Sequence, residues 1–71
     1  MDKINKFSQR VKELRKEKGW TQLQLAEQIG YKLGAVSEWE NRHKEPSFDT
    51  LIKLANVFNV STDYLLGRVD Y

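Results

Sequence analysis

Apolar residues recur every three or four positions along most of the chain, which is the spacing of one buried face of an α-helix. The first such run contains Ile4, Phe7, Val11 and Leu14, and the helix it predicts ends at Gly19. No alternating apolar pattern is long enough for a β-strand. The pattern as a whole predicts five helices, and therefore an all-α fold in the form of a compact five-helix domain.

Two short helices are predicted between residues 21 and 41, separated by a sharp turn. Thr21 is a favourable N-cap, and Gln24 three residues later can complete a capping box with it. Gly30 can take the left-handed conformation that ends the first of these helices. Two helices joined in this way form a helix-turn-helix, in which the outer face of the second helix can meet DNA. The positions expected to face inward are Leu23, Ala26 and Ile29 in the first helix and Val36 and Trp39 in the second.

A polar loop follows at residues 41–45, and Pro46 closes it. Ser47 is predicted to cap a fourth helix, and Asn59 to end that helix in the left-handed conformation. Its apolar residues recur at helical spacing, so it is expected to supply much of the core. The predicted inner positions are Leu51, Leu54, Ala55 and Phe58.

The last predicted helix is short. Ser61 is expected to cap it, Gly67 to end it, and residues 68–71 to form a tail. We interpret residues 1–71 as a single helix-turn-helix domain with a core that spans about 4–67. With 71 residues, 39% of them hydrophobic, the chain can bury one modest core. Its stability must therefore come from well-matched helix packing or from a partner subunit.

The composition argues against a metal site, a cofactor and a catalytic centre. There are no cysteines, and His43, the only histidine, cannot make a zinc site alone. A catalytic nucleophile needs a base beside it, and the only histidine lies in a polar loop. The sequence also has no Gly-rich loop of the kind that binds phosphate. No apolar run approaches the length of a membrane span, and the N-terminus lacks the apolar segment of a signal peptide. We therefore expect a soluble cytoplasmic protein that needs no cofactor and is not an enzyme.

The basic residues are concentrated near the N-terminus. The first 20 positions hold seven Lys or Arg and three Asp or Glu, whereas the rest of the chain holds five basic and seven acidic residues. A run of charge on a helix is often only a solvated face, and that alternative stays open. Beside a helix-turn-helix, the same run also suits a surface that faces the phosphates of a nucleic acid.

Five segments of the chain carry a family resemblance. In order they read RVKELRKEKGWTQ, LAEQIG, AVSEWEN, PSFDTLIKLANVF and STDYLLG. Together they resemble the Cro/CI-type (xenobiotic-response-element-like) helix-turn-helix domains of phage repressors and bacterial regulators, over roughly residues 4–67. The resemblance implies a lambda-repressor-like domain that binds double-stranded DNA as a sequence-specific transcriptional regulator, expected to be a repressor. It also implies a homodimer on a palindromic operator, in a bacterial or phage-encoded protein associated with the nucleoid.

In the resembling domains the third helix contacts the bases, which here implies Lys32, Leu33, Gly34 and, one turn later, Glu38. Leu33 can pack on a thymine methyl while Gly34 lets the backbone approach the groove. Lys32 can donate to a guanine or a phosphate, and Glu38 is restricted to the amino group of cytosine. The same small, partly apolar face also fits a second interpretation, in which the scaffold binds a protein as an antitoxin-like or adapter module.

The resemblance also implies that Gln22, directly after the cap of the second helix, contacts a phosphate, and the first helix and the loop after the third offer further positive or hydrogen-bonding groups. The positive end of its helix would help Gln22 in this role, although capping is an alternative for that residue. His43 fits an ordinary exposed loop histidine equally well. Related domains often have Gly where Arg42 stands, so Asn41 or Arg42 is expected to take a positive φ. The full set is Arg10, Gln22, Ser37, Asn41, Arg42, His43 and Lys44.

Arg15 and Glu40 match positions at which the resembling domains have a largely buried ion pair. Such a pair would lock the third helix to the first without touching DNA, and the alternative is two solvated charges. Losing either partner of a buried pair strands the other charge. We therefore expect the two residues to have a structural role.

A dimer patch is expected around the last helix, because a domain this small has little core left to cover its apolar residues. Related domains also pair in this region. The alternative is that Leu65 and Leu66 only close the core while the tail frays. So small a patch predicts a dimer that forms on the operator rather than in free solution. The patch residues are Val60, Tyr64, Leu65, Val69 and Tyr71.

Overall fold

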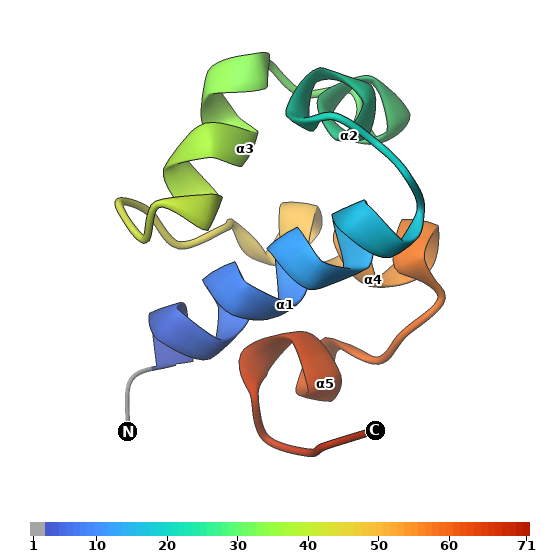
Figure 1. Cartoon of the computed structure of the whole chain (residues 1–71). Coiled ribbons are helices and arrows are strands. Elements are labelled where there is room, and N and C mark those ends of the chain that lie inside the picture. The colour runs from blue at the N-terminus through green and yellow to red at the C-terminus, as the bar shows by residue number, and fades with distance from the viewer. Residues whose placement is uncertain (1–2) are drawn as a thin grey trace.

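The computed structural model describes the backbone of residues 3–71 and the side chains of residues 6–71. The described residues form five α-helices and no strand (Figure 1), which confirms the predicted all-α, five-helix fold. The side chain of Ile4, predicted on the inner face of the first helix, lies outside the described residues. The helices are α1 (Lys3–Glu17), α2 (Gln22–Ile29), α3 (Leu33–Glu40), α4 (Phe48–Phe58) and α5 (Thr62–Leu66).

The capping signals of the sequence are confirmed at the helix ends. The hydroxyl of Thr21 accepts a hydrogen bond from the Gln24 amide at 3.1 Å, and the Gln24 side chain accepts one from the Thr21 amide at 2.8 Å. This is the predicted capping box of α2. Gly30 ends α2 with a φ of 73°, while Ser47 and Ser61 cap α4 and α5. Local sequence therefore sets both ends of α2 and leaves only a short turn before α3.

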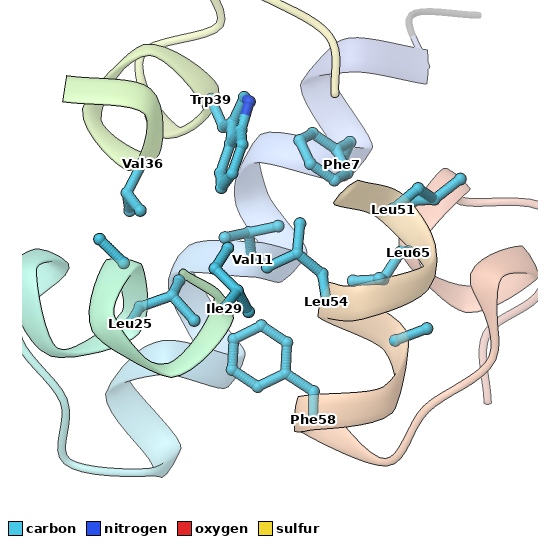
Figure 2. Close-up of a cluster of buried hydrophobic side chains, with 12 residues drawn as sticks. Phe7, Val11, Leu25, Ile29, Val36, Trp39, Leu51, Leu54, Phe58 and Leu65 are labelled. Carbon is cyan, nitrogen blue, oxygen red and sulfur yellow. The ribbon is translucent and has the colours of Figure 1, made fainter. Parts of the chain in front are cut away.

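All five helices contribute side chains to one hydrophobic core, which Figure 2 shows in close-up. Val36 and Trp39 fix the inner side of α3 to this core. The ring of Phe7 on α1 meets Trp39 edge-on, with 6.4 Å between ring centroids and 74° between the planes, which is a favourable aromatic geometry. The buried apolar residues are Phe7, Val11, Leu25, Ala26, Ile29, Val36, Trp39, Leu51, Leu54, Ala55, Phe58 and Leu65.

One residue of α2 departs from the predicted pattern. Leu23 is 50% exposed, whereas Leu25, Ala26 and Ile29 are buried. Successive residues lie about 100° apart around a helix, so Leu23 points roughly 200° away from Leu25. The prediction that Leu23 faces the core is therefore wrong, and Leu25 takes that place.

Helix α1 crosses the middle of the molecule in Figure 1. Helix α3 packs on α1 and α2, whereas α5 packs on α1 and α4. The pair α2 and α3 therefore lies on one side of α1, and α5 lies on the other (Figure 1). Within the described residues, no helix combines the length and the apolar character that crossing a membrane requires.

Candidate nucleic-acid interface

The outer side of α3 is open to solvent near the start of the helix. Lys32, Leu33 and Gly34 are exposed there, and Leu33 is 47% exposed. Lys32 stands at the N-cap position but makes no side-chain hydrogen bond to the helix. The Glu38 side chain, one turn later, is 43% exposed. Because the opposite side of α3 is buried, these four residues lie on or directly before a helix that is itself fixed in place.

An open depression lies where this face of α3 meets the preceding turn. Its lining combines small residues, one aromatic ring and one charge of each sign. This surface offers an apolar contact, a hydrogen-bond donor and an acceptor, which are the kinds of contact that read base edges in the major groove. The lining residues are Gly30, Tyr31, Lys32, Gly34, Ala35 and Glu38.

The loop after α3 is exposed and turns sharply. Arg42 has a φ of 63° and Asn41 a φ of −91°, so Arg42 is the residue with the predicted positive φ. The side-chain amide of Asn41 donates a hydrogen bond to the Ser37 hydroxyl at 3.2 Å. Lys44 Nζ lies 3.7 Å from Glu38 Oε2, and the Lys44 side chain is 67% exposed. The loop thus places several polar groups beside the C-terminal end of α3, and its exposed members are Asn41, Arg42, His43, Lys44 and Glu45.

Within the described residues, no three His, Cys, Asp or Glu side chains come close enough together to hold a metal ion. His43 lies in the loop as an exposed residue, and its backbone amide donates to the carbonyl oxygen of Glu38 at 2.8 Å. The backbone around His43 is therefore tied to α3, whereas its side chain is on the surface.

Arg15 and Glu40 join α1 to the end of α3. Arg15 Nε donates to Glu40 Oε2 at 2.7 Å and Nη2 donates to Oε1 at 3.0 Å, while Nη1 donates to the carbonyl oxygen of Trp20 at 2.8 Å. The Glu40 side chain is only 3% exposed. The hydrogen bond to Glu40 raises the pKa of Arg15, in opposition to burial, which lowers it. Arg15 therefore keeps its charge in a largely buried position.

Gln22 contacts the same carboxylate. Its Nε2 donates to Glu40 Oε1 at 3.1 Å, and its backbone starts α2 directly after the Thr21 cap. A glutamine amide has a second N–H and a carbonyl oxygen, so this bond leaves one donor for another acceptor. The side chain of Gln22 is thus oriented between α2 and α3.

Arg10 is not presented to solvent, which corrects the expectation that it contacts a phosphate. It follows Phe7 by one turn of α1 and is only 8% exposed. Its Nη1 donates to the carbonyl oxygens of Tyr64 at 2.5 Å and Val69 at 2.6 Å, and Nη2 lies 3.3 Å from Asp70 Oδ1. The guanidinium also stacks 4.2 Å from the centre of the Tyr64 ring. Arg10 therefore anchors the C-terminal segment to α1.

One residue of the predicted dimer patch, Leu65, does not lie on the surface. Leu65 is fully buried in the core and cannot touch a second subunit, because it closes the contact of α5 with α1 and α4. Val60, Tyr64 and Val69 are half-buried, and Tyr71 is 90% exposed. The tail that carries Val69 and Tyr71 is held by Arg10, so this surface has a defined shape.

Tyr31 belongs to the depression, although the sequence pattern did not single it out. Its hydroxyl accepts a hydrogen bond from Thr50 on α4, and its ring lies 5.8 Å from that of Trp39. The hydrogen bond with Thr50, and then one with Ser47, lowers the pKa of Tyr31. Thr50 is 1% exposed, and a buried hydroxyl requires a partner. The burial of Thr50 results from tertiary packing, so no local signal in the sequence predicts this link between α4 and the turn.

Comparison with known proteins identifies similar chains. A model of the helix-turn-helix family matches residues 11–65. The HTH-type transcriptional regulator ImmR of Bacillus subtilis (strain 168) is 45% identical over 62 residues, which are 87% of this chain and 49% of ImmR. The HTH-type transcriptional regulator SinR of Bacillus licheniformis is 40% identical over 65 residues, 90% of this chain and 59% of SinR. The chain spans about half the length of the curated relatives it matches.

A solved structure has the same fold over almost its whole length. It is the crystal structure of the restriction-modification controller protein C.AhdI from Aeromonas hydrophila, with a TM-score of 0.79 and 32% sequence identity. The match covers 87% of this chain and 94% of C.AhdI. The similarity therefore includes the α2 and α3 pair and the helices that support it.

Proposed function

This chain belongs to the helix-turn-helix family, and from that premise we propose that it is a sequence-specific DNA-binding transcriptional regulator that acts as a repressor. The observation that carries the proposal is the two-sided α3, whose inner side is fixed to the core while its outer side is exposed and chemically varied. ImmR and SinR are named as transcriptional regulators, which supports the same function. A role in binding rather than catalysis follows.

In the proposed complex α3 enters the major groove. An α-helix with its side chains is about 10–12 Å across, and the major groove is roughly 12 Å wide, so the groove admits α3. Leu33 would contact a thymine methyl, Lys32 a guanine or a phosphate, and Glu38 the amino group of a cytosine. The pair Glu38 and Lys44 offsets the repulsion between the Glu38 carboxylate and nearby phosphates.

The proposed phosphate contacts lie at the start of α2 and after α3. Gln22 is oriented at the positive end of α2, where backbone amides also favour an anion. The others are polar groups that can approach the DNA backbone on either side of the groove, and all except the half-buried Ser37 are exposed. They fix the position of α3 without reading sequence, and they are Ser37, Asn41, Arg42, His43 and Lys44.

We propose a homodimer that pairs on a palindromic operator. The surface formed by Val60, Tyr64, Val69 and Tyr71 is the candidate contact, and two subunits on one face of the duplex would place half-site centres about 34 Å apart. We propose that such a dimer represses transcription by occupying a promoter. The expected location is the bacterial cytoplasm, at the nucleoid.

Selection from a random duplex library tests the proposal. The expected result is an enriched motif with two-fold symmetry, bound with an affinity that falls steeply as salt rises. A library that stays random after repeated rounds, together with binding that is independent of sequence, would contradict it. That outcome would favour the antitoxin-like or adapter module.

A further inference from the structure

Gly34 occupies the second position of α3, where the fold itself gives no reason for a glycine. Glycine is the least favourable helix residue after proline. The other three glycines have positive φ values of 73° to 80°, whereas Gly34 is not among the residues with positive φ. A Cβ placed on Gly34 would meet no heavy atom within 4 Å. The protein therefore has room for an alanine at this position, and the alanine would improve the helix.

The residues around Gly34 indicate which kind of group fits the space left by its missing side chain. Gly34 lines the open depression at the start of α3, together with Tyr31 and Ala35. Leu33, its neighbour in sequence, is 47% exposed. The surface around the missing side chain is thus mainly apolar, and it faces the side on which DNA is proposed to bind.

We propose that Gly34 is a specificity-determining residue, and that the C5-methyl group of a thymine packs against its backbone beside Leu33. The inference rests on the proposed function of α3 in the major groove. The thymine methyl is the apolar group that base pairs present there, whereas the other base edges require a donor or an acceptor. Gly34 has no polar side chain to offer them, but its lack of a Cβ allows the methyl to approach closely.

The proposal predicts a complementary pair of changes. Gly34→Ala adds one methyl group to the protein, and replacing thymine by uracil removes one methyl group from the DNA. In the wild-type protein, uracil at one position of each half-site should weaken binding about fourfold per half-site, or roughly sixteenfold for the dimer, because each half-site loses one buried methyl-sized group. Gly34→Ala should bind the thymine operator at least tenfold more weakly, because two methyl groups compete for one space.

The experiment measures affinities of both proteins for the selected operator, with each thymine of a half-site replaced by uracil in turn. At the contacted position, uracil should restore most of the affinity that Gly34→Ala loses. Melting temperatures of both proteins check the fold, and Gly34→Ala is expected to melt higher than the wild type. Asn56→Ala is the matched control, since it improves an exposed position of α4 and should leave binding unchanged.

The possible results distinguish a failure of the proposed DNA-binding function from a failure of the proposed role of Gly34. Wild-type protein that selects no duplex overturns the proposed function and this inference with it. Wild-type protein that binds its operator, with Gly34→Ala binding equally well, overturns the inference alone. The same holds if uracil has the same effect on both proteins at every position, because contacts that meet in space must show coupling.

Discussion

Gln22 of α2 and Glu40 of α3 are joined by a hydrogen bond of 3.1 Å, and the oxygen that accepts it also accepts one from Arg15 at 3.0 Å. The residue proposed to contact a phosphate is therefore oriented by the ion pair that fixes α3. Removing Gln22 leaves Glu40 paired with Arg15, whereas removing Glu40 strands a buried charge. A substitution of Gln22 is therefore expected to change DNA affinity without changing stability, whereas a substitution of Glu40 is expected to change both.

Gln22→Ala is expected to weaken binding to all DNA sequences by about tenfold per subunit, the value of one hydrogen bond to a charged group. The slope of log affinity against log salt should not change, because the lost group is neutral and releases no counterion. Gln28→Ala, at an exposed position of the same helix, is the control and should bind normally. A loss confined to the selected operator would contradict the phosphate role.

Arg15→Ala should lower the free energy of unfolding by roughly 3–5 kcal/mol, because it leaves the buried Glu40 carboxylate without its partner. Lys16→Ala removes the same charge from an exposed neighbouring position and should cost less than about 0.5 kcal/mol. Urea denaturation of the two variants measures the difference. Equal midpoints and slopes would mean that the ion pair has no structural role.

Helix ends and inner positions were mostly predictable because their signals are local. The capping box of Thr21 and Gln24, the left-handed Gly30 and Asn59, and the apolar spacing of α4 each depend on residues close together in sequence. The sequence leaves two candidates for the positive φ after α3, Asn41 and Arg42, and Arg42 has it. Such features follow from backbone geometry and amphipathic spacing alone.

Apart from Leu23, whose exposed place on α2 follows from helical spacing, the errors concern contacts between distant segments. The charge of Arg10 suggests a solvent-exposed phosphate contact, but Arg10 lies on the side of α1 that meets the C-terminal segment, 54 residues away at Tyr64. Leu65 was assigned to a surface patch although α5 packs it into the core. The Tyr31 contact with Thr50 also joins separate elements. Each of these contacts depends on tertiary packing, which the spacing of residues along a helix does not reveal.

Arg10→Ala should lower the free energy of unfolding by roughly 2–4 kcal/mol, since it removes charged hydrogen bonds to the carbonyl oxygens of Tyr64 and Val69. Lys12→Ala, at an exposed position on the same helix, should have almost no effect. Thermal denaturation measures stability, and limited proteolysis should show faster cleavage after α5 in Arg10→Ala. An unchanged salt slope for the folded variant would agree with its burial, and a reduced slope would restore Arg10 to the phosphate contacts.

The salt dependence of wild-type binding provides a count of phosphate contacts. If each subunit of a dimer neutralises about three phosphates, through Lys32, Arg42 and Lys44, log affinity should fall with log salt with a slope of roughly −5. Lys44→Ala should make the slope shallower by about 0.9 per subunit and weaken all sequences equally. Its stability should stay unchanged, because Lys44 makes only an exposed 3.7 Å ion pair with Glu38. A slope near zero for the selected operator would contradict docking of α3 in the groove.

Tyr71 offers the cleanest test of the dimer surface, because its side chain is 90% exposed and replacement should not disturb the core. Truncation after Gly67 is less informative, since it also removes the Val69 carbonyl that Arg10 binds. Tyr71→Asp replaces an apolar contact by two like charges across the two-fold axis, and such juxtapositions oppose association. Phe48→Asp makes a comparable change at another exposed aromatic residue, 86% exposed at the start of α4.

Sedimentation of each protein with and without the selected duplex measures subunits per operator. Wild type and Phe48→Asp should be monomeric alone at micromolar concentration and should fill both half-sites together, because a patch this small supports pairing only when DNA holds the subunits close. Tyr71→Asp should bind the first half-site normally and the second about tenfold more weakly, a difference of about 1.4 kcal/mol in pairing. One wild-type subunit per duplex at saturation, or Tyr71→Asp filling both half-sites as readily as Phe48→Asp, would mean that the surface around α5 serves only the fold of each subunit.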